Sequence, residues 1–251
     1  MPTIPKITLV GAGPGDPDLI TVKGLKALQT ADVVLYDALA NEALLSHAPR
    51  HALKVCVGKR AGKHSIRQEN IESLMVKLAF EKGHVVRLKG GDPYVFGRGH
   101  EELEFIQPYG IQVQVVPGIS SAIAVPGSQG IPVTRRDVSE SFWVVTATTK
   151  SGAFSQDIKL AAASSATVVI LMGLKKIGEI VKAYQNIDKG NEPVMVVQNG
   201  TLPGERWVIS TIDEIEEEIR KTGISTPAII VVGKVVNLHP AIAQKIQAAA
   251  V

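Results

Sequence analysis

The stretch KITLVGAGPGDPDLI, residues 6–20, decides the fold of this chain. An apolar run rich in β-branched residues leads into glycines at alternate positions, and a helical pattern follows. A strand that ends in a glycine loop before a helix is typical of the first unit of a parallel α/β sheet. Dinucleotide-binding domains use a similar turn to hold phosphates, so the stretch also raises the question of which ligand it serves.

The spacing of the glycines argues against a phosphate-binding turn. A dinucleotide fingerprint requires G-x-G-x-x-G, whereas this chain has G-x-G-x-G. Pro14 and Pro17 also remove two backbone N–H donors from the loop. Asp37 follows at the position expected of a ribose-binding acid, which keeps the dinucleotide interpretation open. A P-loop is excluded, because no G-K-[ST] follows the glycines.

Beyond this stretch, strand-like runs alternate with helical patterns through the first half of the chain. This alternation predicts parallel strands joined by right-handed crossovers. Gly83 follows a lysine-bearing helical turn and fits a helix C-cap. The expected strands are 33–37, 53–58, 84–92 and 112–118, and the expected helices are 25–31 and 67–83.

The second half has fewer helices per strand, and RWVIS (206–210) fits a hairpin partner, so a mixed sheet is expected there. The small-residue stretch between the halves marks the domain junction. The predicted organisation is an N-terminal α/β domain with a parallel sheet (1–118), a linker and cleft segment (119–137) and a C-terminal α/β domain with a mixed sheet (138–251). Outside the junction, the strand-like runs are 142–148, 167–173, 193–200, 206–211 and 227–236, and a charged helix is expected at 212–223.

The composition is that of a globular enzyme: 251 residues, 45% hydrophobic and 20% charged. A net charge of +3 is too small to indicate a nucleic-acid partner, although it suits a small acidic ligand. The single cysteine, Cys56, excludes an internal disulfide and a cysteine-built metal site, and its apolar run predicts a core position. The apolar runs are too short for a membrane span and a signal pattern is absent, so we expect a cytoplasmic protein.

In both halves, the strand-like runs end in loops that contain glycine or aspartate. Examples are GAGPGDP (11–17), GGDPYVFGRG (90–99) and QNGT (198–201). In an open parallel sheet, ligands bind beyond the carboxyl ends of the strands. The pattern therefore predicts that these loops converge on one ligand site, without naming the ligand.

Several of these fragments together resemble the tetrapyrrole methylases. They are VGAGPGDPDLITVKGLKALQTADVVLYDAL, LKGGDPYVFGRGHEE, VVPGISSA, GIPVTRRD, LMG, VVQNGT and PAIIVVG, and they span about residues 6–236. GAGPGDP and a GGDP loop occur widely in the family. GGDPYVFGRG followed by acidic residues is more specific, and it is similar to the branch that methylates uroporphyrinogen III.

The resemblance implies methyl transfer from S-adenosylmethionine to two pyrrole rings of uroporphyrinogen III, giving precorrin-2 and S-adenosylhomocysteine. It also implies two α/β/α domains with an active-site cleft between them, a homodimer, and no metal or nicotinamide. No additional dehydrogenase or ferrochelatase segment is expected. Two alternatives stay open: another tetrapyrrole (precorrin) methyltransferase, and a nucleotide-binding module without chemistry.

The resemblance also implies which residues contact the cofactor. Glycines admit a ligand against the backbone, serines offer small hydroxyls and methionine offers a soft apolar surface, so these residue types suit it. Alternatively, the glycines only make turns, ISSA (119–122) only begins a helix, and the methionine is core. The implied cofactor residues are Pro14, Gly90, Gly91, Asp92, Val95, Ser120, Ser121, Met172 and Gly200.

Uroporphyrinogen carries eight carboxylates, which arginines can pair bidentately. By resemblance, Arg98, Glu101 and Arg136 contact the substrate. Alternatively, Glu101 is an acid in the first turn of the helix GHEELEFI (99–106), and Arg136 is a solvated surface charge.

After methyl transfer, the ring system must lose a proton. By resemblance, Asp37 accepts a proton and Lys59 donates one, and Arg98 has a share in catalysis beside its substrate role. A guanidinium is a poor base, because its pKa is so high. Alternatively, Asp37 caps the helix expected at 38–48, and Lys59 is one of several solvated cations.

Overall fold

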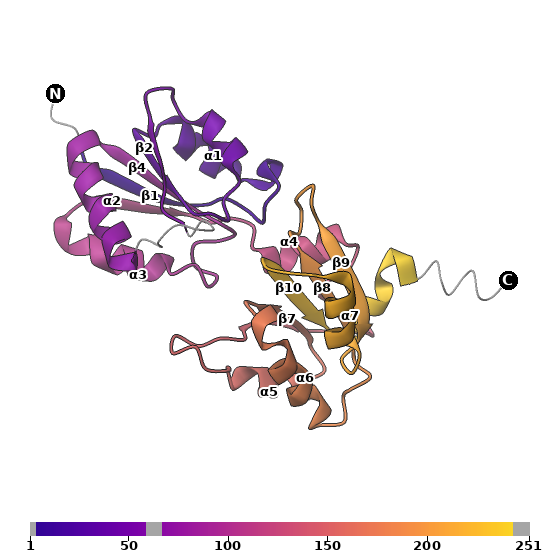
Figure 1. Ribbon diagram of the computed structural model, residues 1–251. Coiled ribbons are helices and arrows are strands. Elements are labelled where there is room, and N and C mark those ends of the chain that lie inside the picture. The colour runs from indigo at the N-terminus through magenta and orange to yellow at the C-terminus, as the bar shows by residue number, and fades with distance from the viewer. Residues whose placement is uncertain (1–3, 59–66, 243–251) are drawn as a thin grey trace. The chain divides into compact units, whose positions relative to one another are not determined.

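The computed structural model describes residues 4–58 and 67–242 of the chain. The chain divides into two compact units, Met1–Ser120 (unit 1) and Ser121–Val251 (unit 2). Each unit is built around its own five-stranded sheet (Figure 1). The division falls within the small-residue segment 119–137, whose residues Ser121–Ser128 form helix α4.

The sheet of unit 1 is entirely parallel, in the order β3-β2-β4-β1-β5. Its central strand β1 pairs with β4 on one side and β5 on the other, so that Ile7 lies between Val85 and Val113. The parallel sheet expected from the alternating pattern is confirmed. The strands are β1 (Lys6–Gly11), β2 (Val33–Tyr36), β3 (Leu53–Cys56), β4 (His84–Lys89) and β5 (Gln112–Val116).

Helices cover both faces of this sheet (Figure 1). Leu28 of α1 and Leu44 of the 3-10 helix η2 belong to one buried apolar cluster, while α2 and α3 supply residues of another. Gly83 ends α2 with φ +113°, which confirms the predicted C-cap. The elements are η1 (Pro17–Leu19), α1 (Val22–Gln29), η2 (Glu42–His47), α2 (Gln68–Lys82), α3 (Gly99–Ile106) and η3 (Gln107–Tyr109).

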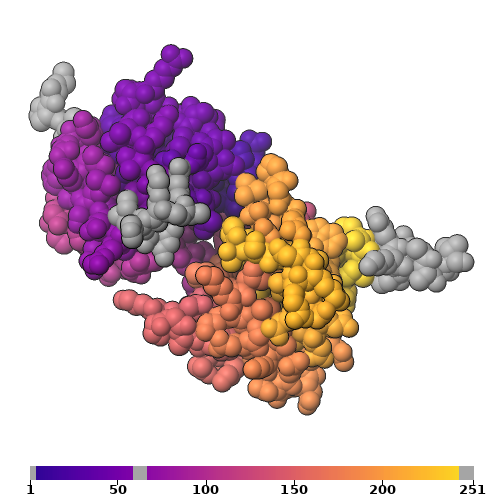
Figure 2. Space-filling view, in the orientation of Figure 1, coloured from indigo at the N-terminus to yellow at the C-terminus, as the bar shows by residue number. Residues whose placement is uncertain are grey.

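The sheet of unit 2 is mixed, in the order β6-β7-β10-β8-β9, as the sequence predicts. β6 and β7 are parallel, β10 is antiparallel to both of its neighbours, and β8 forms a hairpin with β9, the RWVIS strand. The loop of this hairpin projects from the surface of unit 2, orange in Figure 2. The strands are β6 (Phe142–Thr146), β7 (Thr167–Leu171), β8 (Pro193–Gln198), β9 (Arg206–Thr211) and β10 (Ala228–Val232).

Unit 2 also has helices on both faces of its sheet. One buried cluster joins the sheet to α5, α6 and α7, and another joins it to α4 and η5. Both units are therefore three-layered α/β/α structures. Across the described residues, no helix is long and apolar enough to cross a membrane. The elements are α5 (Asp157–Ala163), η4 (Leu174–Lys176), α6 (Ile177–Gln185), α7 (Ile215–Thr222) and η5 (Lys234–Leu238).

His84 is buried at the amino end of β4 as a neutral imidazole. Its Nδ1 lies 2.9 Å from the Thr30 carbonyl oxygen, so Nδ1–H donates there. Its Nε2 lies 2.8 Å from Thr8 Oγ1 and, in the neutral ring, accepts a hydrogen bond from that hydroxyl. Burial lowers the pKa of His84, because desolvation disfavours the imidazolium.

The stability of unit 1 should therefore fall in acid. Between the lowered folded pKa and the unfolded pKa of about 6.5, the unfolded chain binds more protons, so the free energy of unfolding drops as pH falls below about 6.5. Urea unfolding of the wild type at pH 7.5 and 5.5 should show this loss, and His84→Gln should reduce it. His239 in unit 2, whose pKa burial also lowers, adds a loss of the same sign.

Exposed His47 provides the matched control, since His47→Gln should keep the wild-type pH dependence. If His84→Gln leaves the difference between the two pH values unchanged, the buried imidazole is not its source.

Candidate active site

The loops that follow β1, β4 and β5 are pressed together at the carboxyl edge of the sheet in unit 1. A Cβ atom added to Gly118 would lie 2.3 Å from the Gly91 carbonyl oxygen, and one added to Gly11 would lie 2.4 Å from the Gly118 nitrogen. Real Cβ atoms do not approach backbone so closely. These glycines are therefore required for backbone packing.

Backbone hydrogen bonds at this edge explain why the loop after β1 does not form a phosphate-binding turn. The N–H of Ala12 donates to the Lys89 carbonyl oxygen at 2.7 Å, and that of Gly13 donates to the Gly91 carbonyl oxygen at 3.2 Å. Because Pro14 has no N–H, the loop has few donors left for an anion.

Asp92 ties the loop after β4 to the loop after β5. Its Oδ2 accepts from the Gly118 N–H at 3.0 Å, and its Oδ1 accepts from the Tyr94 N–H at 2.8 Å. Gly91 beside it has φ +66°, yet an added Cβ would meet nothing within 4 Å. The edge is thus closed at Gly118 and open at Gly91.

The segment after Asp92 holds two residues in the left-handed region, Phe96 at φ +55° and Arg98 at φ +58°. Non-glycine residues in that region cost about 1–3 kcal/mol each and cluster at functional sites. Tyr94, Val95 and Phe96 are all exposed. This segment therefore presents apolar side chains and the Arg98 guanidinium in a strained, defined conformation.

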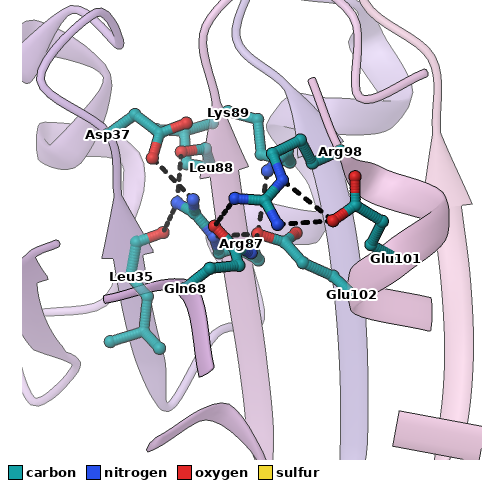
Figure 3. Close-up of polar contacts among 9 residues, drawn as sticks. All are labelled: Leu35, Asp37, Gln68, Arg87, Leu88, Lys89, Arg98, Glu101 and Glu102. Carbon is teal, nitrogen blue, oxygen red and sulfur yellow. Dashed lines mark hydrogen bonds and ion pairs between the residues drawn. The ribbon is translucent and has the colours of Figure 1, made fainter. Parts of the chain in front are cut away.

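Figure 3 shows a cluster of four charged side chains, which we call the buried ion cluster. Its members are the buried Arg87, Lys89 and Glu102 and the partly exposed Asp37. Glu102 of α3 is fully buried. Its Oε1 lies 2.9 Å from Lys89 Nζ and 3.2 Å from Arg87 Nε. Arg87 Nη2 reaches Asp37 Oδ1 at 2.5 Å.

Burial shapes the electrostatics of this region. It lowers the pKa of Lys89 and raises the pKa of nearby Glu72, because each charged form loses water. Within the described part of the chain, Glu102 Oε2 has no hydrogen-bond partner. Desolvation therefore opposes the charged forms of Lys89 and Glu72, as happens both at functional positions and in structural ion-pair networks.

Arg98 lies beside the cluster and pairs with Glu101 in the first turn of α3. Its Nε and Nη2 both donate to Glu101 Oε2, the Nε contact measuring 2.9 Å. The Glu101 hydrogen bond raises the pKa of Arg98. Gln68 connects Arg98 to the buried ion cluster (Figure 3). Its Nε2 donates to Glu102 Oε1 at 3.0 Å, and its Oε1 lies 3.5 Å from Arg98 Nη1.

Unit 2 has its own strained loops, at the ends of β7 and β8. Met172 has φ +55° and a 55% exposed side chain, and Thr201 has φ +67°. A Cβ on Gly200 would lie 2.5 Å from Val125 Cγ1 of α4. Glu205 fixes this loop, since its Oε2 accepts from the Thr201 N–H at 2.7 Å.

The structure places the sequence-predicted residues as follows. In unit 1, Arg98 pairs with Glu101, and Asp37 pairs with Arg87 (Figure 3). The two pairs are connected through Glu102 and Gln68. Lys59 is outside the described residues. Arg136 is exposed in unit 2, and no ion pair with a described residue involves it. In unit 1 lie Pro14, Gly90, Gly91, Asp92, Val95 and Ser120, and in unit 2 lie Ser121, Met172 and Gly200.

The structure also bears on several alternatives left open by the sequence. Asp37 does not cap the following helix: Asn41 does, its Oδ1 accepting from the Ala43 N–H at 2.9 Å. Glu101 does lie in the first turn of its helix. Met172 is exposed, so its interpretation as core is wrong. Cys56 is only partly buried, packed against the core.

Sequence reasoning missed the buried ion cluster. Its signal is the alternation in VVRLK (85–89), which puts Arg87 and Lys89 on one face of a strand expected to be buried on both. Two cations on a covered face require a buried acid. Glu102 lies on the next helix, and its partner role could have been inferred from that requirement.

The two glycines of this edge should respond differently to substitution. Gly118→Ala should lower the free energy of unfolding by about 3 kcal/mol or more, because its methyl group overlaps backbone of two strand ends. Gly91→Ala should cost only about 1–2 kcal/mol, from its left-handed φ. Urea unfolding of both variants measures the difference. Equal losses would contradict the assigned packing.

Comparison with known proteins identifies the wider group. The family model for tetrapyrrole (corrin/porphyrin) methylases matches residues 6–216. A uroporphyrinogen-III C-methyltransferase of Methanocaldococcus jannaschii is 47% identical over 93% of this chain and 97% of its own length. The chain spans about half the length of the curated siroheme synthases it matches.

Solved structures agree. A uroporphyrin-III C-methyl transferase of Thermus thermophilus, complexed with S-adenyl homocysteine, has a TM-score of 0.80 at 38% identity, over 93% of this chain and 99% of its own. A cobalt precorrin-4 methyltransferase has a TM-score of 0.81 at 31% identity, over 92% of this chain and 95% of its own. With this fold and a family model matching most of its length, the chain belongs to the tetrapyrrole methylases.

Proposed function

We propose that this protein transfers methyl groups from S-adenosylmethionine to two pyrrole rings of uroporphyrinogen III, giving precorrin-2 and S-adenosylhomocysteine. The observation that carries the proposal is the nearly full-length, 47% identical match to a uroporphyrinogen-III C-methyltransferase. The proposal also includes a homodimer, as the resemblance implies, and a cytoplasmic location.

Each transfer forms one carbon–carbon bond and breaks one bond between sulfur and the methyl carbon. The electron pair of the new bond comes from the pyrrole, and the sulfonium becomes a thioether. The methylated macrocycle then carries an extra positive charge until it loses a proton to a base. Because the sulfonium methyl is already reactive, the chain's main tasks are to align the two partners and to take that proton.

The carboxyl edge of unit 1 suits the cofactor role that the resemblance implies for Gly90, Gly91 and Asp92. Gly91 leaves open space where any other residue would place a Cβ, so a ligand can approach the backbone there. Asp92 keeps the loop in place through two backbone N–H groups. The same resemblance gives cofactor contacts to Pro14, Val95, Ser120, Ser121, Met172 and Gly200.

The charged residues suit a polycarboxylate substrate. Arg98 and Arg136 are exposed, and a guanidinium can pair with a carboxylate through two N–H groups. Glu101 sets the orientation of Arg98. For proton transfer, the proposal keeps Asp37 as acceptor and Lys59 as donor, with Arg98 in a supporting role.

A precorrin methyltransferase is the second candidate function. The TM-score of 0.81 to the cobalt precorrin-4 methyltransferase is as high as that to the Thermus enzyme, so the fold does not separate the two. Sequence identity favours the uroporphyrinogen substrate, at 47% for the Methanocaldococcus relative against 31% for the precorrin enzyme.

The deciding experiment couples enzymatically made uroporphyrinogen III to this protein under anaerobic conditions with S-adenosylmethionine. The absorption spectrum and mass of the product should show two added methyl groups. If S-adenosylhomocysteine binds but uroporphyrinogen III is not methylated, the precorrin alternative replaces the proposal. Binding of NAD in place of S-adenosylhomocysteine would instead indicate a nucleotide-binding module.

Asp37→Asn should separate chemistry from cofactor binding. The amide keeps the shape of the carboxylate but cannot accept the proton, so kcat should fall by about 100-fold or more. The Kd for S-adenosylhomocysteine, measured by calorimetry, should stay within about twofold, because the cofactor roles lie elsewhere. Unchanged turnover would show that Asp37 is not the proton acceptor, while the proposed methylation activity would still stand.

A further inference from the structure

We propose that Arg87 is a positioning residue that fixes the Asp37 carboxylate for proton transfer. The inference rests on the proposed function, in which Asp37 is the proton acceptor. The resemblance assigns no role to Arg87, and the residue is only 2% exposed. It therefore acts through Asp37 rather than on the substrate.

The Arg87 guanidinium is held from several sides. Its Nε donates to Glu102 Oε1 at 3.2 Å, and its Nη1 lies 3.4 Å from the carbonyl oxygens of Leu35 and Leu88. These partners come from α3, β2 and β4. Because the guanidinium is planar, holding Nε and Nη1 fixes where Nη2 points, which is toward Asp37 (Figure 3).

Asp37 is held at one oxygen only. Its Oδ1 lies 2.5 Å from Arg87 Nη2, whereas Oδ2 has no hydrogen-bond partner within the described ranges. The side chain is 28% exposed, just after the end of β2. One oxygen is therefore anchored to the protein interior, and the other is available to receive a proton in a fixed direction.

Stability alone does not account for this arrangement. Burying an arginine, a lysine and a glutamate together costs desolvation energy that apolar residues of similar size would avoid. The arrangement does hold Arg87 in place, through Glu102 Oε1 and the carbonyl oxygens of Leu35 and Leu88. A rigid donor beneath a partly exposed acid is what proton transfer in a defined direction requires.

The test compares Arg87→Gln and Arg87→Lys with wild type in the uroporphyrinogen III assay. Arg87→Gln should lower kcat by about 10-fold or more while leaving the Kd for S-adenosylhomocysteine within about twofold. Arg87→Lys should restore part of kcat, because an ammonium keeps the charge but not the planar fork. Each rate is divided by the concentration of sites that bind S-adenosylhomocysteine, so partial unfolding does not count as loss of activity.

Arg220→Gln is the matched control, because it breaks an exposed arginine–glutamate pair on α7 of unit 2. It should leave kcat and KM unchanged. Should Arg87→Gln not fold, Arg87→Lys, which keeps the buried charges balanced, carries the test by itself.

The decisive measurement is a double-mutant cycle with Asp37→Asn. If Arg87 works through Asp37, adding Arg87→Lys to Asp37→Asn should lower kcat by less than about twofold further. A further loss as large as that of Arg87→Lys in wild type would overturn the inference, as would a wild-type kcat per binding site in both Arg87 variants. Failure of the wild type to methylate uroporphyrinogen III would instead reject the proposed function.

Discussion

The close approach of three strand ends, at Gly11, Gly91 and Gly118, is the constraint on which unit 1 depends. With only hydrogen atoms at Gly11 and Gly118, the loops after β1, β4 and β5 lie backbone against backbone, and the Gly91 carbonyl oxygen is part of the contact. The backbone N–H groups of Ala12 and Gly13 donate hydrogen bonds to carbonyl oxygens of Lys89 and Gly91, so they are not available to a ligand. This edge therefore offers a ligand a shaped surface with a few polar groups, and not a set of backbone N–H donors.

Charged side chains lie next to this edge. The buried ion cluster lies between the sheet and α2 and α3, and its members come from β4, α3 and the loop after β2. Arg98 and Glu101 extend the polar region to the surface through Gln68. One connected set of hydrogen bonds and ion pairs thus joins the fully buried Glu102 to side chains that solvent reaches.

Much of the fold could be predicted from the sequence, because its signals are local. Strand and helix periodicity, the Gly83 cap and the hairpin at RWVIS (206–210) each depend on a few neighbouring residues, and the structure confirms them. The alternation in VVRLK was visible too. What could not be read was its partner: Glu102 meets Arg87 only after α3 folds onto the sheet.

The residues of the candidate site divide in the same way. Resemblance could pick out Asp37, Arg98 and Glu101, which the structure places in one connected set of polar contacts in unit 1. The distinction between Gly91 and Gly118 depends instead on three-dimensional packing. Both follow a strand and both look like turn residues, yet only one has room for a side chain.

The glycine packing also limits how such a site can diversify. At Gly11 and Gly118 the backbone of one loop contacts the backbone of another, so any other residue would place a side chain where there is no space for it. Substitution costs less at exposed positions such as Tyr94 and Val95, whose side chains are not part of the core. A new substrate preference on this scaffold would therefore be expected to arise in that short segment, with the supporting edge inherited unchanged.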